Sequence, residues 1–115
     1  MITIYHNNRC SKSRQTLGLI EAQGMAPEVI DYLKTPPDKA TLSKLIQYLE
    51  VPVREIIRTG EDMYKTLNLK DSSLSDEQLL DAIVAHPKLL QRPIVVRGDR
   101  AIIGRPPENV LDLLK

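Results

Sequence analysis

The sequence predicts an α/β protein whose mixed sheet is covered by helices, and three observations support this fold class. The chain opens with a strand, a helix and a second strand in that order. Its middle part is predicted to be helical, and its last part combines a β-hairpin with a closing helix. At 115 residues, the chain is expected to form one domain over residues 1–115 around a single hydrophobic core.

The first three elements follow from local patterns. Residues 2–5 alternate and carry β-branched side chains, which is typical of a short strand. Ser11 or Ser13 is expected to cap a helix that runs to about residue 23. The segment at residues 28–33, which Thr35-Pro36-Pro37 ends, predicts a second strand.

The middle of the chain is predicted to be a helical insertion. Asp38 is expected to cap a helix, and short helical pieces are expected at residues 52–58 and 62–69. The sequence Ser-Asp-Glu-Gln at residues 75–78 is a capping-box pattern that opens a further helix. The residues expected to face inward in the two longer helices are Leu42, Leu45, Ile46 and Leu49, then Leu79, Leu80, Ile83 and Val84.

The last part of the chain predicts a hairpin and a helix. Residues 94–96 and 101–103 are rich in β-branched side chains and flank a turn at Gly98-Asp99. Pro107 fits the first turn of a closing helix. The inward face of that helix is expected to consist of Val110, Leu111 and Leu114.

Composition argues against several functional classes. Sixteen basic and 15 acidic side chains give a net charge of +1, so no long-range field attracts a polyanion, and four tyrosines without Trp or Phe offer no stacking platform for single strands. We therefore expect no nucleic acid as a partner. We also expect no membrane association, because no apolar run approaches the roughly 20 residues of a membrane span. A single cysteine and no signal-peptide pattern indicate a cytoplasmic protein.

That cysteine, Cys10, lies in a cation-rich loop between the first strand and the first helix. A helix N-terminus and nearby cations stabilise a thiolate, and Arg9, Lys12 and Arg14 surround the sulfur in sequence. The alternative is a small buried hydrophobic residue, the common fate of a lone cysteine. Because so many charges flank it, we predict a reactive thiol.

The chain also resembles a known family at several landmarks that occur in order over nearly its whole length. The landmarks are His6-Asn7-x-x-Cys10-x-x-Ser13-Arg14, Tyr32-Leu-x-x-Pro-Pro37, Arg58, Gln91-Arg92-Pro93-Ile94-Val95 and Gly104-Arg105-Pro106. Together they resemble the glutaredoxin-coupled arsenate reductase (ArsC) family. The resemblance implies a thioredoxin-like fold with a helical insertion in the middle of the chain.

The resemblance further implies site residues and a reaction. Cys10 would be the nucleophile, with His6 close to it and Ser13 in the same substrate-binding loop. The arginines that would bind arsenate or a similar oxyanion are Arg58, Arg92 and Arg105, and the Arg92-Pro93 peptide would be cis. Glutathione would act as co-substrate and glutaredoxin as partner, with no bound cofactor and no metal.

Alternatives to this interpretation remain at the sequence level. Each arginine alone is most often a solvated surface residue, and His6 could be a satisfied histidine without a chemical role. A related Spx-like module that binds a protein partner shares the fold, but Ser13 replaces the second cysteine of its Cys-x-x-Cys switch. A glutathione-using thiol enzyme with another substrate is the third interpretation. In this chain Asn8 stands where the family commonly has proline, which predicts a less stiff loop.

Overall fold

The computed structural model describes residues 1–115, which form two compact units. The first consists of residues 1–35 and 92–115, and the second of residues 36–91. The second unit is the helical insertion predicted for the middle of the chain. The expectation of a single domain over residues 1–115 stays a prediction.

The first unit contains a four-stranded mixed sheet in the order β2-β1-β3-β4. Strand β1 (Ile2–His6) pairs in parallel with β2 (Glu28–Asp31) and antiparallel with β3 (Ile94–Arg97), and β3 pairs antiparallel with β4 (Arg100–Ile103). The parallel pair arises because a helix connects its strands, whereas the two-residue turn between β3 and β4 makes a hairpin. The predicted mixed α/β sheet is therefore confirmed.

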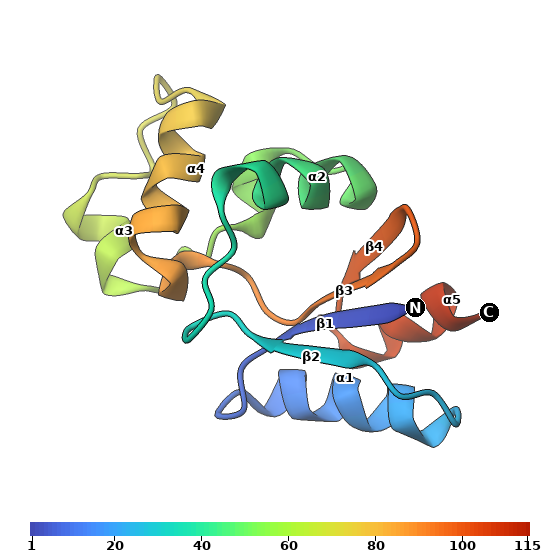
Figure 1. The fold of residues 1–115 in the computed structure, drawn as a ribbon. Helices are drawn as coiled ribbons and strands as arrows, with labels where there is room; N and C mark the ends of the chain where they lie inside the picture. Colours follow the sequence, from blue (N-terminus) through green and yellow to red (C-terminus); the bar gives the residue numbers. More distant parts are fainter. The chain divides into compact units, whose positions relative to one another are not determined.

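Two helices cover one face of this sheet, as Figure 1 shows: α1 (Ser11–Ala22) and α5 (Val110–Leu114), which the 3-10 helix η3 (Pro107–Asn109) precedes. One cluster of buried apolar side chains joins them to the strands, because alternate residues of a strand face the same side. Its members are Ile2, Ile4, Ile20, Val95, Val110, Leu113 and Leu114. This core holds α1 against the strand that precedes it.

The open end of the β3–β4 hairpin packs tightly against α1. The Gly104 amide donates to the Pro93 carbonyl at 2.9 Å, and the Thr16 hydroxyl lies 3.4 Å from the Gly104 carbonyl. A Cβ at residue 104 would lie 2.5 Å from Thr16 Oγ1 and 2.8 Å from Pro93 Cγ. Only glycine allows this approach without displacement of the helix or the proline.

The second unit is helical. It consists of α2 (Lys39–Leu49), η1 (Val53–Ile56), α3 (Asp62–Thr66), α4 (Asp76–Ala85) and η2 (Pro87–Leu89). As predicted, Asp38 caps α2 by accepting from the Thr41 amide, and Ser75 and Gln78 form a capping box on α4. Helix α2 packs against α4, and Lys39 on α2 forms ion pairs with Glu77 and Asp81 on α4.

Two expectations for individual residues were wrong, and one core residue was not predicted. The N-cap of α1 is Cys10, not Ser11 or Ser13, so the helix begins directly at the thiol. Val84 is 39% exposed, because it lies at the edge of the apolar stripe of α4. Leu113 was not predicted as a core residue but is buried, because it lies three residues after Val110 and so faces the same side of the closing helix.

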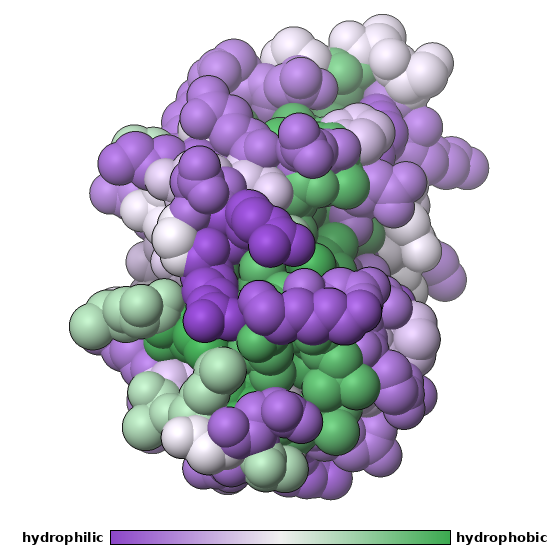
Figure 2. Space-filling model, turned by 90° about the vertical axis from the view of Figure 1, so that its right-hand side faces the viewer, coloured by the Kyte–Doolittle hydropathy of each residue, from purple (hydrophilic) through white to green (hydrophobic).

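Hydrophilic side chains make up much of the face displayed in Figure 2, with hydrophobic ones visible between them. No helix of the structure combines the length and the apolar character that a membrane span requires. The large apolar side chains that remain exposed are Met1, Val29, Leu33, Leu67 and Val84.

We predict that Gly104→Ala destabilises the protein by about 1–3 kcal/mol, because the added methyl group overlaps Thr16 and Pro93. The matched control is Gly18→Ala on the exposed side of α1, where a Cβ meets nothing within 4 Å. That change should stabilise by about 0.5–1 kcal/mol, since alanine is the better helix former. Urea unfolding of both variants measures the difference. Equal effects of the two substitutions would contradict the close approach.

Candidate active site

Cys10 lies where the chain passes from β1 into α1. A tight turn follows His6, in which the Cys10 amide donates to the Asn7 carbonyl at 3.0 Å. The Cys10 carbonyl then accepts from the Arg14 amide at 3.0 Å, which is the first bond of the helix. The half-buried sulfur therefore lies at the positive end of α1, among amides that have no partner within the helix.

Two arginines reach this position from the β3–β4 hairpin. Ile94 pairs with Ile103 across the ladder. Continuing that register outward places Pro93 opposite Gly104 and then Arg92 opposite Arg105. The Arg92-Pro93 and Arg105-Pro106 peptides are both cis. The hairpin thus brings together two guanidinium groups that are 13 residues apart in sequence.

Both guanidinium groups contact the thiol. Arg105 Nη1 lies 3.8 Å from Cys10 Sγ and donates to the Arg92 carbonyl at 3.0 Å. The Arg92 side chain also hydrogen-bonds the sulfur. One half-buried thiol and two permanent cations therefore share a single place in the structure.

The pKa of Cys10 is lowered from 9.0 to about 7. Burial opposes this by favouring the neutral thiol. The Ser13 amide, the guanidinium groups of Arg92 and Arg105 and the Lys12 amide together outweigh burial by favouring the thiolate. No capping hydrogen bond of standard geometry joins the sulfur to these amides, so they act on it as dipoles.

The predicted source of the positive charge was wrong in part. The Arg14 guanidinium donates to the Asn8 carbonyl at 2.9 Å, and the side chains of Arg9 and Lys12 are exposed. Water and salt screen exposed charges of this kind. The cations that act on the sulfur come instead from the hairpin.

His6 and Ser13 form a buried pair beside the thiol. Their Nδ1 and Oγ atoms are 2.6 Å apart, and the Ser13 hydroxyl also accepts from the Asn7 amide at 3.0 Å. Burial lowers the pKa of His6, although the Asn8 side chain and Asp31 oppose this shift, so the ring stays neutral at neutral pH. With its hydroxyl fully buried, Ser13 presents only its amide to Cys10. These two residues hold the loop in place, and a direct role in catalysis or in substrate binding stays a prediction.

Arg58 belongs to the second unit and is described within it. Its amide donates to the Leu89 carbonyl at 2.7 Å, next to a short antiparallel bridge between Ile57 and Leu90. Its Nε lies 3.4 Å from Glu61 Oε1 in an ion pair. The backbone of Arg58 is therefore firmly held, and its role at the oxyanion stays a prediction.

Sequence reasoning missed Tyr32 as a site residue. Its side chain is fully buried, and its hydroxyl accepts from Asn7 Nδ2 at 3.4 Å and hydrogen-bonds the Arg92 side chain. The signal that could have revealed it is the position directly after a strand that pairs in parallel with β1, since the carboxyl ends of parallel strands meet at one edge of a sheet.

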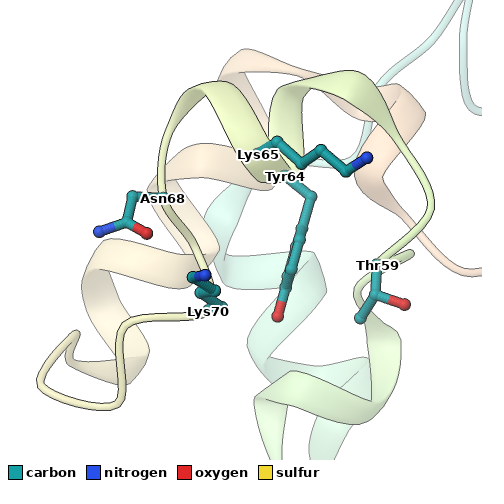
Figure 3. A pocket seen from close by; sticks show the side chains of 5 residues that line it. All are labelled: Thr59, Tyr64, Lys65, Asn68 and Lys70. Atoms are coloured by element: carbon teal, nitrogen blue, oxygen red, sulfur yellow. The ribbon is translucent and has the colours of Figure 1, made fainter.

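Other sites of the structure lack this convergence. No group of three or more His, Cys, Asp or Glu side chains could hold a metal ion. A cavity of about 360 Å³ in the second unit is lined by Thr59, Tyr64, Lys65, Asn68 and Lys70. In Figure 3 the side chains of Lys65 and Asn68 extend in opposite directions, so the lining groups do not converge on one ligand.

We predict that the rate of Cys10 alkylation follows a titration with its midpoint near pH 7, and that Arg105→Gln shifts the midpoint upward toward 9.0. A rise of one unit would cut the thiolate fraction at pH 7 about fivefold. Iodoacetamide kinetics across pH measure this. The control is Arg100→Gln, which removes an exposed guanidinium at the far end of the same hairpin and should leave the midpoint unchanged. A wild-type midpoint at or above that of a free thiol would refute an activated cysteine.

Comparison with known proteins identifies the family. A model of the ArsC family matches residues 5–113. The uncharacterized protein YfgD of Escherichia coli strain K12 is 55% identical over 98% of this chain and 96% of its own length, and an arsenate reductase of Haemophilus influenzae is 45% identical over 98% of each. The solved structure of an arsenate reductase from Vibrio cholerae matches with a TM-score of 0.95 and 54% identity, covering 96% of this chain and 95% of that one. The mixed sheet with its helical insertion is thus the thioredoxin-like fold of these proteins, and the chain belongs to the ArsC family.

Proposed function

We propose that this protein reduces arsenate to arsenite, with Cys10 as the nucleophile, glutathione as the co-substrate and glutaredoxin as the protein reductant. The observation that carries the proposal is the contact of one low-pKa thiol with two guanidinium groups. Relatives named arsenate reductase, 45% or more identical over nearly the whole chain, support the choice of substrate.

The charges at the site suit this chemistry. Arsenate is a tetrahedral oxyanion that carries one to two negative charges near neutral pH, so a thiolate that attacks it meets repulsion. Arg92 and Arg105 offset that repulsion, because guanidinium groups stay protonated and present forked donors that match oxyanion edges. Donors held in place before the reaction need no rearrangement as charge develops on the oxyanion. Arg58 would supply a third such group.

In the first step the Cys10 thiolate forms a bond to arsenic, and an arsenic-bound oxygen leaves as hydroxide, which a proton converts to water. The thiol of glutathione then attacks the Cys10 sulfur, the sulfur–arsenic bond breaks, and its electron pair stays on arsenic. Arsenic is thereby reduced from the pentavalent to the trivalent state and leaves as arsenite. The two sulfurs are oxidised to a mixed disulfide between Cys10 and glutathione, and glutaredoxin reduces this disulfide to restore the thiol.

The single cysteine fits this scheme. Two electrons are needed for each arsenate, and one protein thiol cannot form a disulfide within its own chain. The second sulfur must therefore come from outside. A reducing compartment that supplies glutathione, such as the cytoplasm, is the location that we propose.

We predict arsenite production in an assay that contains arsenate, glutathione and glutaredoxin, and its loss in Cys10→Ser, because a serine hydroxyl is not ionised at neutral pH. Arg92→Lys should raise the KM for arsenate roughly 10- to 100-fold, because lysine keeps the charge but loses the fork. Direct measurement of arsenite over time gives both values.

The reductant provides the decisive control. In glutathione-free buffer with thioredoxin as the only reductant, we expect no sustained turnover. Continued arsenite production under those conditions would refute the glutaredoxin-coupled mechanism. A different result is that the wild-type protein fails to reduce arsenate and turns over another oxyanion or a disulfide. That result would show that Cys10 acts on a substrate other than arsenate.

A further inference from the structure

We propose that Tyr32 is a positioning residue whose hydroxyl ties the loop that carries Cys10 to the guanidinium of Arg92. The inference adds a residue to the site proposed above, and its kinetic consequence rests on that proposed function. The expected effect on the pKa of Cys10 is independent of that function, because thiol reactivity is measured without arsenate.

The first half of the tie runs from Tyr32 to the Cys10 loop. The side chain of Tyr32 is fully buried, and its hydroxyl accepts a hydrogen bond from Asn7 Nδ2 at 3.4 Å. The other end of the same amide, Asn7 Oδ1, accepts from the Arg9 amide at 2.9 Å. Asn7 therefore links the tyrosine hydroxyl to the backbone amide of Arg9, the residue directly before Cys10.

The second half runs from Tyr32 to Arg92, whose side chain hydrogen-bonds both the tyrosine hydroxyl and the Cys10 sulfur. A hydroxyl oxygen has two lone pairs, so it can accept from Asn7 and from Arg92 at once. The tyrosine itself is fully buried, and hydrogen bonds to a buried hydroxyl are stronger than in bulk water.

Sheet register explains why these residues meet. His6 pairs with Asp31 in the parallel ladder, so the next position places Asn7 beside Tyr32. Tyr5 pairs with Ile94 in the antiparallel ladder, so two residues further Asn7 lies opposite Arg92. The hairpin register then adds Arg105. A row of Tyr32, Asn7, Arg92 and Arg105 thus crosses the sheet just beyond its last paired residues.

Arginine has a long, flexible side chain, and a cation acts on a thiolate only if it stays within contact distance. The hydrogen bond from Arg92 to the Tyr32 hydroxyl restrains the guanidinium at the sulfur. Without the hydroxyl, the guanidinium samples positions away from the sulfur, which weakens thiolate stabilisation and oxyanion binding together.

The test is Tyr32→Phe, which keeps the buried ring and removes only the hydroxyl. The midpoint of the Cys10 alkylation profile should rise, and the alkylation rate at pH 7 should fall about two- to fivefold. The control Tyr48→Phe removes a tyrosine hydroxyl on α2 for which the structure shows no hydrogen bond, and should leave both values unchanged.

The same substitution in an Arg92→Gln background separates positioning from general loosening of the loop. If Tyr32 acts through Arg92, Tyr32→Phe has no further effect on the midpoint once the guanidinium is gone. An equal rise in both backgrounds, or an unchanged midpoint in the single variant, overturns the inference.

Arsenate kinetics then separate this inference from the proposed function. Tyr32→Phe should raise the KM for arsenate more than it lowers kcat. If the wild-type chain does not reduce arsenate but Tyr32→Phe still raises the alkylation midpoint only when Arg92 is present, the positioning role stands and the proposed substrate fails. If arsenate is reduced and the midpoint does not move, the positioning role fails.

Discussion

The contact of the Arg105 guanidinium with both the Arg92 carbonyl and the Cys10 sulfur joins segments of the first unit that are far apart in sequence. It requires that the hairpin end in register, because only then do residues 92 and 105 face each other. It also requires that the hairpin pack closely on α1, which the absence of a side chain at Gly104 permits. The fold of this unit thereby places permanent positive charge at the helix end that carries the thiol.

The pKa of Cys10 is lowered because several modest effects together outweigh the cost of its burial. Backbone dipoles at the start of α1 and two guanidinium groups each favour the thiolate. Neutral His6, buried Ser13 and the Asn7 amide shape the loop but contribute no charge at neutral pH. The neutral polar residues thus mainly fix the positions of the charged groups. Electrostatic stabilisation of a thiolate requires such fixed positions.

Local chemistry made much of the fold predictable from sequence. The Asp38 cap, the capping box at Ser75 and the Gly98-Asp99 turn each depend on contacts between residues that are close in sequence. Each of them appears in the structure as predicted. The position of Cys10 at a helix start was also predictable, because a strand, a short loop and a helical pattern follow one another in the sequence. The loop itself did not reveal the source of the charge that lowers the pKa of Cys10, since Arg9 and Lys12 are near in sequence but extend into solvent. Only the family resemblance pointed to Arg92 and Arg105. Arg92 and Arg105 are distant in sequence, and only sheet register brings them to the thiol. The same register explains Tyr32, which the sequence marked as part of a family landmark but not as a residue of the site.

The central claim is that the sulfur of Cys10 and the guanidinium groups of Arg92 and Arg105 form one oxyanion site. A crystal structure of the protein soaked in arsenate tests it most directly. The account predicts a tetrahedral anion against Cys10 Sγ, with donors from both Arg92 and Arg105 within hydrogen-bond distance of its oxygens. An anion bound elsewhere, or one at the sulfur with either guanidinium turned away, would contradict it.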